Sequence, residues 1–180
     1  MVEVMLDLET MGNGPQAAII AIGAVEFDLA KQAIGEEFYT VVDLASSVQA
    51  GGIMDASTVL WWMRQSDEAR AALAVDGKHI ADALLRFSHW MSSRGPKEDL
   101  KVWGNGADFD SVILSSAYQR LSLELPWTHK GNRCYRTVKQ LGAAIETERA
   151  GIAHNALDDA KNQARHLLTL LCPGDWKPLL

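Results

Sequence analysis

Acidic side chains are concentrated at three separate points of the chain, and the first is the stretch Asp7-Leu8-Glu9-Thr10. Asp7 and Glu9 are two residues apart, so on a strand both side chains project from the same face. Two carboxylates at this spacing repel each other unless protons or a cation are held between them. An amphipathic strand with its acidic face in water is the alternative, and the Asp-x-Glu pattern alone does not exclude it.

The second point is the stretch Gly104-Asn-Gly-Ala-Asp-Phe-Asp110, which precedes a predicted helix. Asp108 and Asp110 both lie near the helix start, where free backbone N–H groups and the helix dipole stabilise a carboxylate. One of these acids is therefore expected to be only a helix cap. Asn105 either supports a site beside them or caps the turn.

The third point is the stretch His154-Asn-Ala-Leu-Asp-Asp159, at the entrance of the last predicted helix. An imidazole exchanges protons near neutral pH, so a histidine five residues before an acid is suited to acid–base chemistry. Asp158 and Asp159 both lie outside the apolar stripe of this helix. Periodicity therefore leaves both of them as candidates.

The elements that position these residues follow from the hydrophobic pattern. Alternating or continuous apolar runs predict strands over residues 2–9, 17–28, 37–43 and 101–103. Helices are predicted to begin at Ser57 and Ser66, and to cover residues 80–91, 109–121, 135–144 and a last stretch from 157 to 171. Antiparallel strands followed by alternating helices and strands predict an α/β domain, a mixed sheet flanked by helices.

Composition limits the classes of protein. The 180 residues suffice for one domain over residues 1–180, and 48% hydrophobic residues exclude a disordered chain. No apolar stretch is long enough to span a membrane, and the N-terminus lacks a basic leader region. Two cysteines, Cys134 and Cys172, match neither a disulfide framework nor a zinc site. We therefore expect a reducing, cytoplasmic setting.

The net charge of −6 excludes a protein that coats nucleic acid through a bulk positive field, but it leaves room for a local site. Residues 125–145 contain four basic side chains and no acidic ones. These side chains are candidates for binding backbone phosphates, and a solvated helix face is the alternative. They are Lys130, Arg133, Arg136 and Lys139.

The ordered motifs Asp-x-Glu, Asn-x₃-Phe-Asp and His-x₄-Asp resemble those of the DEDD superfamily of 3′→5′ exonucleases, in its DEDDh, DnaQ-like branch. The resemblance covers nearly the whole chain. Residues 58–70, Thr-Val-Leu-Trp-Trp-Met-Arg-Gln-Ser-Asp-Glu-Ala-Arg, are more closely similar to the phage DexA and exonuclease VIII-related group, which includes a bacterial exoribonuclease subgroup. Three residues separate Asn105 from Phe109, where many members have two, and this leaves Asp108 as a substitute for Asp110.

The resemblance implies an RNase H-like fold with a five-stranded mixed sheet between helices. It also implies hydrolysis of phosphodiester bonds from a 3′ end, which releases nucleoside 5′-monophosphates. Hard oxygen ligands favour Mg²⁺ or Mn²⁺, and the family pattern gives two such ions. The family pattern assigns the metal acids to Asp7, Glu9, Asp110 and Asp159, and the general base to His154.

The expected substrate is a nucleic acid with a free 3′ end, single-stranded DNA or RNA, since no residue pattern identifies a reader of the 2′-hydroxyl. A runner-up is an exoribonuclease that acts on RNA 3′ overhangs, and a different class is a non-catalytic RNase H-like nucleic-acid-binding module. Related enzymes are often dimers, so a homodimer is a further expectation. The substrate-binding candidates are Thr10, Met11, Trp61, Asn105, Lys130, Arg133 and Arg136.

The paired tryptophans have two interpretations. Trp61 or Trp62 can stack on a terminal base, while core packing is the alternative for tryptophans at helical spacing. A helix cannot bury two adjacent side chains on one narrow stripe. We therefore expect one of the two to be partly exposed.

Overall fold

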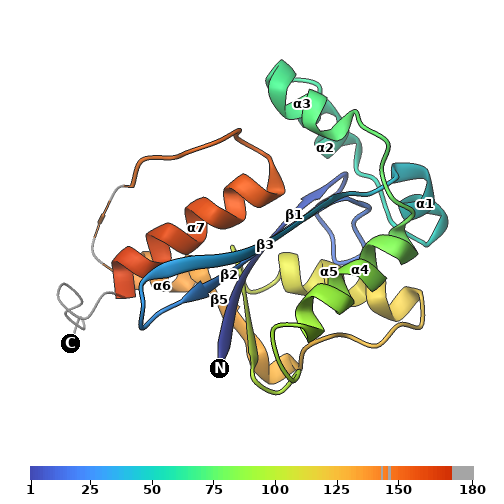
Figure 1. Ribbon diagram of the computed structural model, residues 1–180. Helices are drawn as coiled ribbons and strands as arrows, with labels where there is room; N and C mark the ends of the chain where they lie inside the picture. The colour runs from blue at the N-terminus through green and yellow to red at the C-terminus, as the bar shows by residue number, and fades with distance from the viewer. Residues whose placement is uncertain (143, 146, 172–180) are drawn as a thin grey trace.

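A five-stranded mixed sheet forms the centre of the computed structural model, which describes residues 1–142, 144–145 and 147–171 (Figure 1). The strand order is β3-β2-β1-β4-β5, in which β1, β2 and β3 are antiparallel neighbours and β4 and β5 run parallel to β1. This confirms the expected mixed sheet. The strands are β1 (Val2–Thr10), β2 (Ile19–Asp28), β3 (Ala33–Val41), β4 (Leu100–Gly104) and β5 (Asn132–Cys134).

Helices cover both faces of this sheet (Figure 1). Helices α4 and α5 pack on one face, α6 and α7 pack on the other, and α1 to α3 lie beyond the end of β1. Their bounds are α1 (Leu44–Gln49), α2 (Ala56–Trp62), α3 (Asp67–Leu73), α4 (Ile80–Ser92), α5 (Asp110–Arg120), the 3₁₀ helix η1 (His129–Gly131), α6 (Tyr135–Leu141) and α7 (Ala156–Leu171). In the described ranges, no helix combines the length and the apolar character that a bilayer crossing requires.

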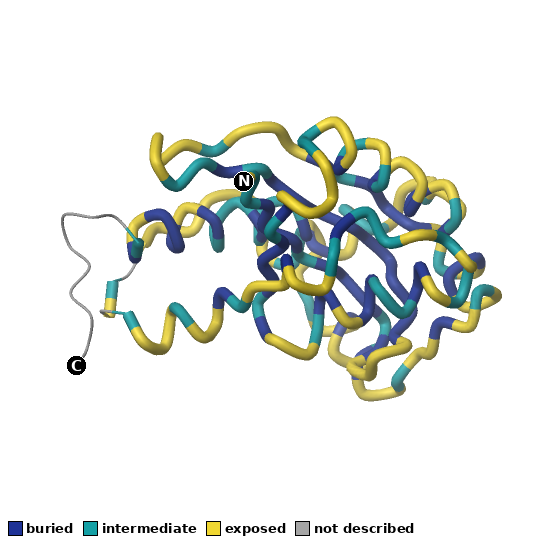
Figure 2. Tube along the Cα trace, turned by 90° about the horizontal axis from the view of Figure 1, so that it is seen from below, coloured by how far each residue is buried: buried dark blue, intermediate teal, exposed yellow. Residues whose placement is uncertain are grey.

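The central strand β1 is buried on both faces, and its alternation decides where its acids point. Leu6 and Leu8 pack with α4 and α5, whereas Met5 packs against α7. Asp7 and Glu9 have the parity of Met5, so they face the α7 side. A fully solvated acidic face is therefore excluded, and Figure 2 shows buried residues gathered in the interior of the molecule.

The first turn of α7 lies directly against β2. A Cβ atom at Gly23 would stand 2.2 Å from the carbonyl carbon of Ala156, so only glycine permits this approach. The side-chain oxygen of Asn155 accepts hydrogen bonds from the N–H groups of Leu157 and Asp158 and so caps the helix. This packing brings the first turn of α7, which carries Asp158 and Asp159, close to the acids of β1.

Several element boundaries differ from the sequence prediction. Helix α2 begins before Ser57, with Asp55 at its N-cap position, and α6 ends at Leu141 because Gly142 follows it. Strand β3 covers Ala33–Val41 rather than 37–43, since Asp43 instead caps α1 through the N–H of Ser46. The pattern missed α1 and β5, and β5 is a three-residue strand defined by its pairing with β4.

Candidate active site

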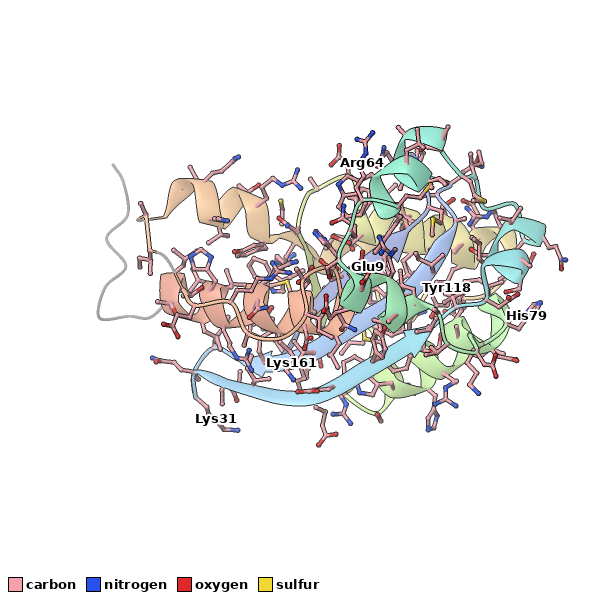
Figure 3. All side chains as sticks on the ribbon, turned by 90° about the horizontal axis from the view of Figure 1, so that it is seen from above. Glu9, Lys31, Arg64, His79, Tyr118 and Lys161 are labelled. Atoms are coloured by element: carbon pink, nitrogen blue, oxygen red, sulfur yellow. The ribbon has the colours of Figure 1, made fainter. Side chains whose placement is uncertain are left out.

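Three carboxylates from two distant elements meet at the end of β1. Asp7 and Glu9 come from β1 and Asp159 from the first turn of α7, and each offers an oxygen within 4.8 Å of the others. The Glu9 side chain lies in the interior, near the middle of the view in Figure 3, and Glu9 is only 7% exposed. The tertiary fold therefore concentrates negative charge in a buried place.

A fourth carboxylate, Asp110, joins this cluster from the start of α5. Its two oxygens accept hydrogen bonds from the N–H of Leu8 (3.2 Å) and from the N–H of Asn105 (2.9 Å). Parallel pairing places the carboxyl ends of β1 and β4 at one edge, so a single side chain can bind both. A Cβ atom at Gly104 would lie 2.9 Å from Asp110 Oδ2, so glycine is needed there. Asp108, the alternative in the sequence, is exposed.

The neighbouring acids at the start of α7 have different surroundings. Asp158 accepts a hydrogen bond from the N–H of Ile152 at 2.8 Å and so holds the preceding loop. Asp159 accepts one from the N–H of His154 at 3.2 Å, and its other oxygen is paired with Arg149. The structure thus places Asp159, and not Asp158, beside Asp7 and Glu9.

Burial and mutual repulsion raise the pKa values of this cluster. Burial, followed by the charges of Asp110, Glu9 and Asp159, raises the pKa of Asp7 well above its usual range. Burial, with Asp159 and Asp110 adding to it, raises the pKa of Glu9 to about 8. Burial raises the pKa of Asp110 to about 6 against its two backbone hydrogen bonds, and it raises that of Asp159 against the charge of Arg149. Protons or cations must therefore offset the negative charge.

These shifts predict how the stability of the metal-free protein depends on pH. When the pKa of a carboxyl group is higher in the native state than in the unfolded state, protonation of that group stabilises the native state. This stabilisation is complete at pH values below the unfolded-state pKa, and it is lost as the pH rises through the native-state pKa. We therefore expect the melting temperature in EDTA to fall between about pH 4.5 and 8, by several degrees for a free-energy change of a few kcal/mol. Calorimetry at four pH values measures this fall, and Glu9→Gln should flatten it. A melting temperature that rises over this range would contradict the assignment.

The same cluster fits a divalent cation. Among the described residues, no hydrogen-bond donor reaches the buried Oε1 atom of Glu9. A buried oxygen without a partner is costly unless a cation completes its coordination. The donor set consists of carboxylate oxygens alone, which suits hard ions such as Mg²⁺ and Mn²⁺. The residues present therefore match the metal that the sequence motifs imply.

His154 lies at the rim of the cluster. Its backbone has a φ of 63°, a conformation that non-glycine residues adopt only when their surroundings impose it. The imidazole packs edge-on against Trp61, with 4.8 Å between ring centroids. Trp61 is 40% exposed whereas Trp62 is buried and donates its indole N–H to the carbonyl of Thr10, so one tryptophan is exposed as expected.

Two cavities flank the carboxylates. The smaller, about 390 Å³, lies on the Glu9 side, and its lining includes Thr10, Trp61 and Phe109. The larger, about 720 Å³, lies on the Asp7 and Asp159 side and is lined mainly by polar residues. Its lining includes Asn105, Lys139, Arg149, His154, Asn162 and Gln163. The cluster is therefore open on two sides to molecules larger than an ion.

The structure places some of the remaining substrate-binding candidates near the carboxylates and others away from both cavities. Arg136 donates a hydrogen bond to the carbonyl of Asn105, which brings its charge close to Asp110. Met11 instead packs beside the buried residues Ile20 and Trp62. Lys130 and Arg133 lie on η1 and β5 and line neither cavity. Of the four basic candidates, Lys139 alone lines the larger cavity, and Arg136 is bound to Asn105, which also lines it.

Two residues of the site were missed by the sequence reasoning. Gln163 donates a hydrogen bond from its amide to Asp7 Oδ1 at 2.7 Å. It follows Asp159 by four residues on α7, so helical spacing could have indicated it. Arg149 lies between regular elements and pairs with Asp159 across ten residues. No periodic signal predicts that contact.

The fold of this chain is similar to that of solved structures that include exonucleases. The chain is similar to the nuclease domain of 3′hExo, a DEDDh family member bound to rAMP, with a TM-score of 0.66 and 18% identity over 97% of this chain and 93% of that one. It is also similar to E. coli exonuclease I in complex with a dT13 oligonucleotide, with a TM-score of 0.66 and 15% identity over 95% of this chain and 41% of that one. The fold is therefore the RNase H-like fold of DEDDh exonucleases.

Sequence comparison defines the family more narrowly. Residues 2–171 match the model of the 3′-5′ exoribonuclease Rv2179c-like domain, and the chain belongs to this family. It is also 29% identical, over 126 residues, to an exodeoxyribonuclease of Enterobacteria phage T4. That match covers 63% of this chain and 54% of the phage protein, so the chain spans about half the length of this relative. The resemblance to the branch containing phage and exoribonuclease members is confirmed.

Proposed function

We propose that this chain is a metal-dependent 3′→5′ exonuclease that hydrolyses single-stranded nucleic acid and releases nucleoside 5′-monophosphates. The observation that carries this proposal is the convergence of buried and half-buried carboxylates from β1, α5 and α7. A non-catalytic binding module has no need of mutually repelling acids that raise one another's pKa. Membership of a family described as exoribonuclease domains supports the same activity.

The proposed division of labour starts with the carboxylates. Asp7, Glu9 and Asp159 would hold the divalent ions, and Asp110 would contribute through oxygen lone pairs that its two backbone hydrogen bonds leave free. When bound, two such ions supply a water that ionises near neutral pH and stabilise charge on the leaving oxygen. Gln163 fixes the orientation of the Asp7 carboxylate through its amide.

His154 is the proposed general base. Its backbone is tied to Asp159, and its ring is held by Trp61 at the edge of the cavity that contains Asp7. The imidazole is thereby positioned to take a proton from the attacking water and to pass it to solvent.

The 3′-terminal nucleotide is proposed to bind in the smaller cavity. Trp61 and Phe109 offer flat apolar surfaces on which an unpaired base can stack, and Thr10 lies beside them. Asn105, Lys139 and Arg136 lie on the other side of the carboxylates, where they can contact backbone phosphates. Met11, Lys130 and Arg133 have no part in this proposal.

The comparisons favour different answers to whether the substrate is DNA or RNA. The family model is described as an exoribonuclease domain, whereas the phage relative is an exodeoxyribonuclease. RNA with a 3′ overhang is therefore the second candidate substrate. Matched 5′-labelled DNA and RNA, each single-stranded or with a 3′ overhang, should give ladders that shorten from the 3′ end in Mg²⁺ or Mn²⁺, whereas recessed 3′ ends should resist. Absence of any ladder with all four substrates would overturn the enzyme assignment.

Metal binding should be visible without substrate. We expect Mn²⁺ at about 100 times its dissociation constant to stabilise the native protein by about 2.7 kcal/mol, which raises the melting temperature by roughly 5–10 °C. Differential scanning fluorimetry measures this shift, and Asp7→Asn should lose most of it. An unchanged melting temperature at saturating Mn²⁺ would show that the carboxylates hold no ion.

Two expectations about the whole chain stay predictions. Residues 1–180 are proposed to form a single exonuclease domain, and limited proteolysis tests whether one resistant fragment remains. A homodimer is the second, and light scattering at several protein concentrations measures the mass.

A further inference from the structure

Arg149 brings a positive charge to the place where a metal ion is expected. Its guanidinium pairs with one oxygen of Asp159, while the other oxygen of Asp159 accepts the N–H of His154. The side chain of Arg149 is 50% exposed, whereas that of Asp159 is 13% exposed. The contact therefore joins a half-buried acid to a cation that remains accessible to solvent.

The backbone beside Arg149 is held in place by α7. The side-chain amide of Asn162 donates to the carbonyl of Ala150 at 2.8 Å, and its oxygen accepts from the N–H of Ala150 at 3.0 Å. Asn162 lies three residues after Asp159, on the following part of the same helix. The start of the Arg149 side chain is therefore fixed, while its half-exposed guanidinium can turn without moving the loop.

A divalent ion held by Asp7, Glu9 and Asp159 would compete with the Arg149 guanidinium for the negative charge of the Asp159 carboxylate. Exposed and half-exposed ion pairs contribute little to stability, so an ion that also binds Asp7 and Glu9 displaces the guanidinium readily. The displaced side chain remains in the cavity of about 720 Å³, which Lys139 also lines. A planar guanidinium matches two oxygens of a phosphate, so a strand entering this cavity offers it a new partner.

We propose that Arg149 is an exchangeable counter-ion, which pairs with Asp159 until a divalent ion binds and then pairs with a backbone phosphate of the substrate strand. The proposal rests on the proposed exonuclease function for its second half. It makes the binding of metal and strand cooperative, because loading the ion frees a cation for the strand.

The test measures two affinities of Arg149→Ala. Without substrate, Mn²⁺ should bind about 2–5-fold more tightly by calorimetry, since the competing cation is gone. A 5′-labelled single-stranded oligonucleotide in Ca²⁺ should bind about 10-fold more weakly by fluorescence anisotropy, since a desolvated phosphate contact is lost. Arg149→Lys should keep part of the oligonucleotide affinity, because it retains the charge but not the two-pronged geometry.

Arg165→Ala is the matched control. Arg165 is an exposed arginine on the same helix as Asp159, and its replacement changes the net charge equally. It should change neither affinity. Circular dichroism verifies that every variant is folded.

Each half of the proposal has an outcome that overturns it. Equal or weaker Mn²⁺ binding in Arg149→Ala would mean that Arg149 positions Asp159 rather than competing for it. Unchanged oligonucleotide binding would remove the phosphate contact. A wild-type protein that binds no oligonucleotide would overturn both the proposed function and this second half, whereas the Mn²⁺ titration decides the exchange at Asp159 separately.

Discussion

Replacing Asp7 with asparagine is expected to lower kcat by at least about 10⁴-fold, because the metal contribution to transition-state stabilisation is several kcal/mol. Asp7 is the carboxylate whose pKa is raised by all three of its acidic neighbours, so it occupies the centre of the cluster. Asparagine keeps the size of the side chain and an oxygen that can accept the amide of Gln163. The loss would therefore report the missing charge rather than a missing shape.

The same variant should be more stable than the wild type when no metal is present. Removing one buried charge relieves repulsion among Glu9, Asp110 and Asp159, for which we expect roughly 2 kcal/mol at pH 8, or about 4–8 °C in melting temperature. Nuclease assays and scanning calorimetry in EDTA measure the two effects. Asp108→Asn removes an exposed charge next to the same site and should change neither. Retained activity, or a lower melting temperature, would contradict the central place of Asp7.

Replacing His154 with alanine is expected to lower kcat by about 10²–10⁴-fold, the usual contribution of a general base. Mn²⁺ affinity should remain within about threefold of wild type, since the site already offers three carboxylates and the imidazole contacts Trp61 instead. Single-turnover cleavage of an oligonucleotide and calorimetric Mn²⁺ titration separate these two properties.

A second variant of His154 separates the loss of the general base from the effect of backbone strain at this position. At a φ of 63° alanine is strained, whereas asparagine adopts this conformation more easily. His154→Asn should therefore have a higher melting temperature than His154→Ala but an equally low kcat. A His154→Asn protein with nearly full activity would rule out a general base at this position. Loss of Mn²⁺ binding in both variants would instead make His154 part of the metal site.

The local properties of the central elements were predictable from the sequence. The spacing of Asp7 and Glu9 predicted that both acids share one face of β1, because side chains alternate on a strand whatever surrounds it. The pattern left open whether that face is solvated, and in the structure it packs against α7. Two adjacent tryptophans on one short helix required that one be exposed, and Trp61 is. The ends of elements were less certain, as the 135–144 prediction for α6 shows, because capping decides the last turn.

The choice between neighbouring acids depended on contacts that span the chain. Asp110 joins the cluster because Leu8, 102 residues away, donates its N–H to it, and this needs parallel pairing of β1 with β4. Asp158 accepts a hydrogen bond from the loop before α7, whereas Asp159 lies beside Asp7. The close approach of α7 to Gly23 fixes the position of the helix and therefore the role of each acid. Neither contact leaves a periodic trace in the sequence.

By itself, the sequence determined which residue types are present, which strand face carries Asp7 and Glu9, and the order of the motifs that place the chain among 3′→5′ exonucleases. Those properties follow from short-range geometry and from motif spacing. Spacing alone left Asp108 or Asp110 and Asp158 or Asp159 open, and the family resemblance favoured Asp110 and Asp159. Only the tertiary structure showed that these two acids lie beside Asp7 and Glu9, that Gln163 donates to Asp7, and that Arg149 pairs with Asp159. Electrostatic pairing depends on distances between residues far apart in the chain, and packing of the helices against the sheet sets those distances.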